Sequence, residues 1–233
     1  MTKKTLRKDK KVNLARKTII GFITLVVVAA GGFGIYVSTD LSGSGDIVEN
    51  EDYLVIENAR PRRTGDPIEV VEFFSYSCIH CKTFDPIVEE WAAAQQSDVV
   101  FKRKPASFSP AWSLLAQAYF TLEAADVLEQ NHSRLFRAIH DARRQFLNPE
   151  MIADYVDGRG ISREEFLREF NSPNVREAMR DADRDQRNYQ ISATPSLVIA
   201  GKYLVGMGGG QSKALRTTDK LIARERGLTD SPE

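Results

Sequence analysis

Cysteine and histidine are scarce in this sequence of 233 residues, which contains two cysteines and three histidines. Two cysteines cannot make a disulfide-rich scaffold, and a structural zinc site usually takes four ligands and is rich in cysteine. Internal repeats are absent, which excludes a solenoid. Because 42% of the residues are apolar and 27% are charged, the disordered, collagen-like and coiled-coil classes are also excluded. The length allows one or two globular domains.

Most of the chain lacks an excess of positive charge. The sequence has 32 basic and 32 acidic residues, but eight of the bases and only one of the acids lie in residues 1–18. Residues 19–37 carry no charge, so residues 38–233 hold the remaining 24 bases and 31 acids. Such an acidic body lacks the electrostatic footprint of a nucleic-acid-binding protein, and we expect no nucleic acid among its partners.

The uncharged run at residues 19–37 has the length of a membrane span. As a helix it would be roughly 28 Å long at ~1.5 Å per residue, close to the thickness of a bilayer core. Bases precede it and residues 38–50 contain none, so we expect a cytoplasmic amino terminus and an exported body. We therefore predict a basic cytoplasmic segment (1–18), a single-pass anchor (19–37), a linker (38–51) and a folded domain (52–233). A signal peptide cleaved near Ala29 and Ala30 is the alternative, and it would export the body as well.

Within residues 52–233, strand and helix patterns alternate. Apolar and β-branched runs predict strands at 53–56, 68–74 and 99–104, and a hairpin at 196–199 and 203–205. Helical patterns cover 78–96, 111–125, 135–139 and 212–226, and further helices should begin after Asn148, Ser162 and Ser172. This order predicts an α/β core with a helical insertion at about 110–190.

The two cysteines form the motif Cys78-Ile79-His80-Cys81 directly after a predicted strand. On a helix that begins at Cys78 the two sulfurs would lie on one face, close enough to bond. Unpaired N–H groups and the helix dipole favour an anion at Cys78, and a cationic His80 would also lower the pKa of this thiol. Cys81, one turn further in, is the expected resolving thiol. The other two histidines, His132 and His140, are expected at surface positions of helices.

Two segments of the sequence resemble the DsbA-type thiol-disulfide oxidoreductases. The first is Val-Glu-Phe-Phe-Ser-Tyr at residues 71–76, followed by the cysteine motif, and the second is Thr194-Pro195 with the apolar run at 196–199 and Gly-Lys-Tyr at 201–203. The resemblance implies a thioredoxin-like fold with a helical insertion and a cis-proline at Pro195. It also implies that Thr194 and Pro195 bind an extended client peptide, and that Glu72 accepts a proton from Cys81. From the residues alone, Glu72 could equally be a structural acid paired with Lys102 or Lys104.

The same resemblance predicts the reaction and the partners. We expect an enzyme on the periplasmic side of the inner membrane that needs no cofactor and donates its Cys78–Cys81 disulfide to reduced or unfolded exported clients. A DsbB-type membrane quinone reductase would re-oxidise it. Two departures from the family pattern, Ile79 in place of the usual proline and the reductase-like Thr194, leave a disulfide reductase or isomerase open. A non-enzymatic metal or peptide chaperone that uses the CxxC motif is a third hypothesis.

Overall fold

The computed structural model describes residues 46–57, 59, 62–63 and 65–229, and of residues 228 and 229 only the backbone. The described residues from Ile47 onward belong to one compact unit. The predicted basic segment (1–18) and anchor (19–37) lie outside the described residues. Within the described part, we find no helix with the length and apolar character that a membrane crossing requires.

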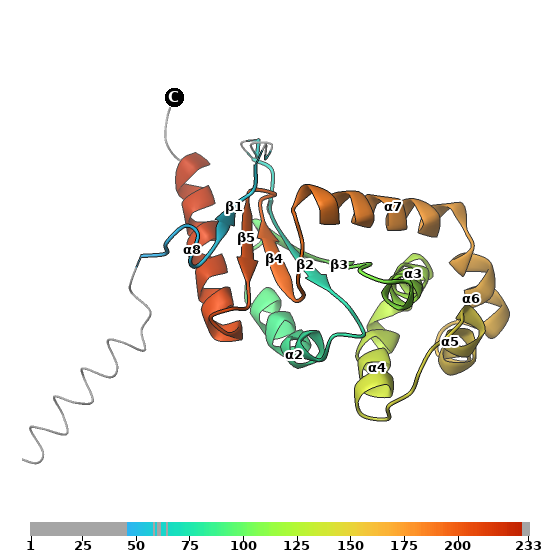
Figure 1. The fold of residues 1–233 in the computed structure, drawn as a ribbon. Coiled ribbons are helices and arrows are strands. Elements are labelled where there is room, and N and C mark those ends of the chain that lie inside the picture. The colour runs from blue at the N-terminus through green and yellow to red at the C-terminus, as the bar shows by residue number, and fades with distance from the viewer. Residues whose placement is uncertain (1–45, 58, 60–61, 64, 230–233) are drawn as a thin grey trace, which may run out of the picture. The chain divides into compact units, whose positions relative to one another are not determined.

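Five strands form one mixed sheet in the order β1-β5-β4-β2-β3 (Figure 1). They are β1 (Leu54–Val55), β2 (Ile68–Phe74), β3 (Val99–Pro105), β4 (Ser196–Ile199) and β5 (Tyr203–Gly206). The interior strand β2 pairs in parallel with β3 and antiparallel with β4. Because β2 is covered on both faces, its sequence reads as a nearly continuous apolar run. The predicted strands are confirmed, with ends shifted by no more than two residues.

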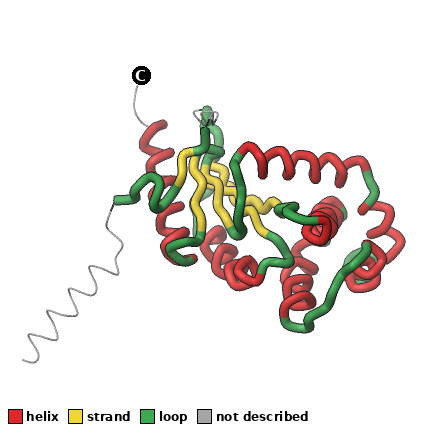
Figure 2. Tube along the Cα trace, in the orientation of Figure 1, coloured by secondary structure: helices red, strands yellow, loops and turns green. Residues whose placement is uncertain are grey.

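The helices divide into two groups (Figures 1 and 2). α2 (Ile79–Ala93) and α8 (Gln211–Thr229) pack against one face of the sheet, where Phe84 and Leu221 meet Val70. The other five lie together between β3 and β4 in the chain: α3 (Pro110–Ala124), α4 (Leu128–His140), α5 (Pro149–Val156), α6 (Arg163–Phe170) and α7 (Pro173–Asn188). The predicted caps at Asn148, Ser162 and Ser172 are confirmed, since each side chain accepts a backbone N–H of its helix.

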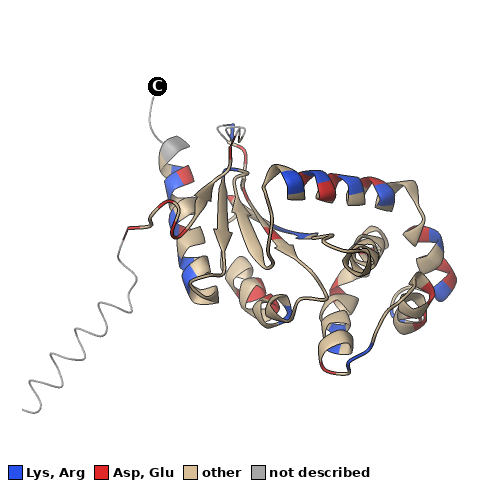
Figure 3. Cartoon of the chain, in the orientation of Figure 1, with Lys and Arg blue, Asp and Glu red and all other residues tan. Residues whose placement is uncertain are grey.

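The largest apolar cluster joins the helical block to the carboxyl end of β2. It combines side chains of α3 to α7 with Phe74 and Tyr76 and with both cysteines. The outer helix α7 carries charges of both signs along its length (Figure 3), and one of them, Asp185, forms an ion pair with Lys104 of β3. The cysteine motif therefore lies at the junction between the sheet and the helical block.

Candidate active site at the Cys78 and Cys81 pair

Cys78 is the N-cap residue of α2. Its extended backbone (φ −91°, ψ 115°) precedes the first helical residue, and its Sγ accepts the backbone N–H of Cys81 at 3.2 Å. The backbone N–H of Cys78 donates to the carbonyl oxygen of Ser75 at 3.0 Å, which closes the turn between β2 and α2. Cys78 is 9% exposed and Cys81 is fully buried, so an incoming sulfur reaches Cys78 first. Both thiols are free in this structure.

The loop before β4 lies against Cys78. The Thr194–Pro195 peptide bond is cis, as predicted, and the Cys78 thiol donates to the carbonyl oxygen of Thr194 at 3.4 Å. Antiparallel pairing of β4 with β2 brings these residues together, because Ser196, which begins β4, pairs with Phe73 near the end of β2. Ser196 Oγ donates to the carbonyl oxygen of Ala193 at 2.9 Å and closes the loop on itself.

The two thiols have very different proton affinities. Hydrogen bonds lower the pKa of Cys78 to about 5: the contact with Cys81 contributes most, and the Thr194 hydroxyl and the backbone N–H groups of Cys81 and His80 add to it. These donors outweigh burial, which acts in the opposite direction. Burial raises the pKa of Cys81, and its hydrogen bond to the Cys78 sulfur raises it further. At neutral pH the reduced pair therefore holds a thiolate at Cys78 and a thiol at Cys81.

His80 acts on Cys78 through its main chain. Its side chain is exposed, whereas its backbone N–H is one of the groups that lower the pKa of Cys78. Because His80 is the second residue of α2, its N–H is one of the unpaired donors at the helix start. The sequence predicts that such N–H groups lower the pKa of Cys78, and it adds a cationic His80 imidazole as a second cause.

Glu72 lies on the face of β2 that α2 covers. It is 1% exposed, and its Oε2 accepts from Nε of Arg103 at 3.1 Å. The partner is Arg103 because parallel pairing sets it directly opposite Glu72, whereas its two neighbours face the other side. The predicted pairing with Lys102 or Lys104 is therefore wrong: Lys102 pairs with Glu69, and Lys104 with Asp185 of α7.

Burial controls the ionisation of Glu72. It raises the pKa of this carboxyl to about 7, although Arg103 opposes the shift. Arg103 also serves a second buried acid, since its Nη2 donates to Oδ1 of Asp85 in α2 at 2.9 Å. One guanidinium thus pairs with two buried acids, Glu72 on β2 and Asp85 on α2.

The family model for the DSBA-like thioredoxin domain matches residues 69–217, which include the cysteine motif and the cis-proline loop. The chain belongs to this family. The thiol:disulfide interchange protein DsbA of Pseudomonas aeruginosa is 33% identical over 206 residues, which is 88% of this chain and 95% of that protein. The DsbA of Azotobacter vinelandii is 35% identical over 213 residues, which is 91% of this chain and 98% of that protein.

Solved structures agree with this assignment. The crystal structure of Pseudomonas aeruginosa DsbA superposes with a TM-score of 0.76 at 33% identity and covers 81% of this chain and 99% of that one. The structure of the oxidoreductase DsbA from Xylella fastidiosa gives a TM-score of 0.73 at 34% identity and covers 78% of this chain and 98% of that one. The fold is thus a DsbA-like thioredoxin fold, and the reaction of this enzyme is thiol-disulfide interchange.

Two histidines of the DsbA-like domain lie where the sequence analysis did not place them. His132 is 4% exposed, with Nε2 at 2.9 Å from Oδ1 of Asp85 and Nδ1 at 2.8 Å from the hydroxyl of Tyr76. His140 is partly buried, and its Nε2 donates to the carbonyl oxygen of Tyr76 at 2.9 Å. The predicted surface positions are wrong, because residues 132, 136 and 140 lie on the face of α4 that meets the core. The sequence did contain a signal for this burial: each histidine is four residues from Phe136, and this spacing places all three side chains on one face of a helix.

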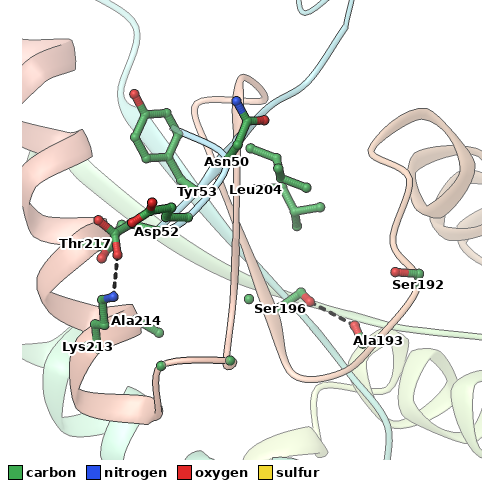
Figure 4. Close-up of a pocket in the computed structure, with 15 residues that line it drawn as sticks. Asn50, Asp52, Tyr53, Ser192, Ala193, Ser196, Leu204, Lys213, Ala214 and Thr217 are labelled. Atoms are coloured by element: carbon green, nitrogen blue, oxygen red, sulfur yellow. Dashed lines mark hydrogen bonds and ion pairs between the residues drawn. The ribbon is translucent and has the colours of Figure 1, made fainter. Parts of the chain in front are cut away.

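A pocket of about 330 Å³ lies beside the loop that precedes β4 (Figure 4). Ser192, Ala193 and Ser196 line one end, and the ion pair between Asp52 and Lys213 lines the other. Neither cysteine lines it, so it is separate from the reacting sulfurs. Among the described residues, no group of three or more His, Cys, Asp or Glu side chains is arranged to hold a metal ion.

Proposed function

We propose that this DsbA-family enzyme works as an oxidant, which donates the disulfide between Cys78 and Cys81 to exported client proteins. The observation that carries this direction is the difference between the two thiols, with the pKa of Cys78 lowered to about 5 and that of Cys81 raised. Contacts that stabilise the Cys78 thiolate exist only in the reduced enzyme, so they favour the reduced enzyme as the product. Thr194 supports the same direction, because its hydroxyl is one of these contacts.

The exchange proceeds in two substitutions at sulfur. A client thiolate attacks Sγ of Cys78, a client–Cys78 bond forms, and the Cys78–Cys81 bond breaks with its electron pair left on Cys81. Cys81 takes up a proton. A second client thiolate then attacks the client sulfur of this mixed disulfide and releases Cys78 as a thiolate. The client gains one disulfide, and the enzyme keeps two electrons and the proton on Cys81.

The surrounding residues have distinct roles in this scheme. Glu72 gives a proton to Cys81 as the enzyme is reduced and accepts it back on re-oxidation, and a pKa near 7 suits both directions at neutral pH. Thr194 and Pro195 bind the extended backbone of the client beside Cys78. His80 supplies its backbone N–H to the sulfur and, when its imidazole is protonated, a further positive charge near the motif.

We also propose a location and partners for the enzyme. Residues 19–37 anchor the enzyme in the inner membrane, and the domain faces the periplasm, where client thiols emerge reduced. A DsbB-type quinone reductase takes up the two electrons, because the reduced pair must be re-oxidised for a second turnover. The run of uncharged residues and the bases before it support the anchor.

Thiol trapping in intact cells tests the direction. The pair should be oxidised at rest, and it should accumulate in the reduced form in cells that lack the DsbB-type reductase. Purified enzyme should oxidise a reduced unfolded protein faster than it reduces insulin. A pair that is reduced at rest, together with faster insulin reduction, would instead establish the reductase direction.

A further inference from the structure

Tyr76, two residues before the nucleophilic cysteine, is held at its hydroxyl and at its carbonyl oxygen by one helix of the insertion. Its hydroxyl lies 2.8 Å from Nδ1 of His132, and its carbonyl oxygen accepts from Nε2 of His140 at 2.9 Å. Both histidines are on α4, two turns apart. Tyr76 itself is 1% exposed, and its ring packs edge-on against Phe74 and Phe136. Rings therefore surround the side chain, and α4 supplies both of its described hydrogen bonds.

Hydrogen bonding assigns the protons in this arrangement. The Asp85 carboxylate is an acceptor, so Nε2 of His132 carries the hydrogen of the 2.9 Å contact between them. Nδ1 then faces the Tyr76 hydroxyl, which can donate to it and whose pKa burial raises well above its ordinary value. The two hydrogen bonds that link Tyr76 to His132 and His132 to Asp85 thus each have one donor and one acceptor. Each of these buried polar groups has a hydrogen-bond partner within the network, and this favours a single arrangement of the three side chains.

The residue that α4 holds belongs to the turn that presents Cys78. Ser75 forms this turn with two contacts: its carbonyl oxygen accepts from Cys78 N–H at 3.0 Å, and its Oγ accepts from Ser77 N–H at 3.1 Å. A shift of Tyr76 would move Cys78 relative to the first N–H groups of α2. Asp141, the residue that follows α4, also forms an ion pair with Lys82 of α2. The insertion thus holds the turn and the helix on either side of the reactive sulfur.

We propose that His132 and His140 are positioning residues for disulfide exchange, and that they clamp Tyr76 so that Cys78 stays aligned with the amino terminus of α2. The inference rests on interchange at Cys78 and Cys81 and does not depend on which direction prevails in the cell. It gives the insertion a part in the reaction besides its contribution to stability: one of its helices fixes the geometry of the nucleophile.

The decisive experiment compares His140→Ala with His140→Gln in the full-length protein. The alanine variant removes the donor to the Tyr76 carbonyl, whereas the glutamine amide restores an N–H in nearly the same place. The readouts are the thiolate absorbance of Cys78 against pH and the equilibrium in which the enzyme disulfide and two glutathione molecules give the enzyme dithiol and glutathione disulfide. His140→Ala should shift that equilibrium toward the enzyme disulfide by about two- to tenfold, the range for one hydrogen bond. His140→Gln should remain close to the wild type.

A second arm tests the other end of the clamp. Tyr76→Phe and His132→Ala should each shift the glutathione equilibrium in the same direction. In free energy, the shift in the double variant should be smaller than the sum of the two single shifts, because both changes remove the same contact. Tyr76→Phe keeps the ring and its packing, so it remains informative if His132→Ala folds poorly.

The matched control is Asn131→Ala. Asn131 is buried on the same helix, but its Nδ2 donates to the carbonyl oxygens of Val127 and Arg159 and does not contact the active-site turn. The Asn131→Ala substitution should lower the midpoint of thermal unfolding and leave the Cys78 titration unchanged. Two results would overturn the proposal. Asn131→Ala could shift the glutathione equilibrium as much as His140→Ala does, or His140→Ala could lower the unfolding midpoint without shifting the equilibrium.

Discussion

The chemistry of this enzyme depends on how two chemically identical side chains are made different. Cys78 meets several hydrogen-bond donors at a helix start, and Cys81, three residues later, is buried with its proton directed to the first sulfur. A buried thiol that leaves exchange as a thiolate needs a proton, and Glu72 is the buried acid whose pKa of about 7 suits that task. The first two predictions concern these residues.

Cys81→Ala should accumulate mixed disulfides between the enzyme and its clients, and Cys78→Ala should accumulate few. Once Cys78 has bonded to a client, Cys81 can no longer resolve the adduct, whereas Cys81 alone is too buried for a client thiol to reach. Non-reducing gels of cells after acid quenching measure the adducts. Equal adduct levels in the two variants would show that clients reach both sulfurs.

Glu72→Gln should stabilise the oxidised protein above pH 7 and not near pH 5. In the native protein burial raises the pKa of Glu72 from 4.5 to about 7. Between these values the unfolded chain releases this proton while the folded chain keeps it, so the wild-type fold loses stability as pH rises. Glutamine does not titrate, and the gain at pH 8 should reach roughly 2 to 3 kcal/mol at most.

Urea unfolding of the oxidised protein at pH 5 and pH 8 measures this difference. Glu69→Gln is the control, because Glu69 lies on the same strand but on the other face, with a partly exposed side chain paired to Lys102. Its effect should be small at both pH values. A gain for Glu72→Gln that does not vary with pH would contradict the assigned ionisation.

At the scale of elements, the site is a meeting of two chain segments that are far apart in sequence. The amino terminus of α2 supplies the N–H groups, and the loop before β4 supplies the hydroxyl of Thr194 to the same sulfur. The position of β2 beside β4 makes this possible, since β2 leads into α2 and pairs with β4 near its carboxyl end. The third prediction separates the contribution of the loop from that of the helix.

Thr194→Val should raise the pKa of Cys78 by about one unit and make the enzyme a weaker oxidant. The change removes the hydroxyl donor but keeps the backbone carbonyl and the shape of the side chain, and a hydrogen bond to a charged group is worth about 1.5–3 kcal/mol. Thiolate absorbance against pH measures the shift. Thr83→Val is a matched control, because that hydroxyl is exposed on α2 and donates to the carbonyl oxygen of His80. An unchanged titration in Thr194→Val would assign the whole effect to the helix terminus.

At the scale of the whole molecule, the prediction concerns the side of the membrane on which the folded domain lies. The eight bases in residues 1–18 and the absence of bases in residues 38–50 predict an exported domain held by residues 19–37. A cysteine placed at Ser44 should react with a membrane-impermeant maleimide in spheroplasts, and one at Thr5 should not. Labelling at Thr5 alone would reverse the orientation, and a mature amino terminus near Gly31 would establish cleavage.

The sequence by itself determined the parts of the site that are local. A strand ending before Cys78, a helix starting after it and a proline directly before β4 are all short-range patterns, because hydrophobic period, capping residues and backbone restriction act over a few residues. These patterns were enough to predict the α/β core, the order of its elements and the cysteine pair.

Only the tertiary structure decided which polar groups meet under α2. Lys102, Arg103 and Lys104 are adjacent cations in the sequence, and strand register alone selects Arg103 for Glu72. Asp85 and His132 are 47 residues apart and become partners because α4 packs against α2. Buried polar contacts of this kind depend on the packing of elements that are distant in sequence. The residues that hold the active-site turn could therefore be identified only once the fold was known.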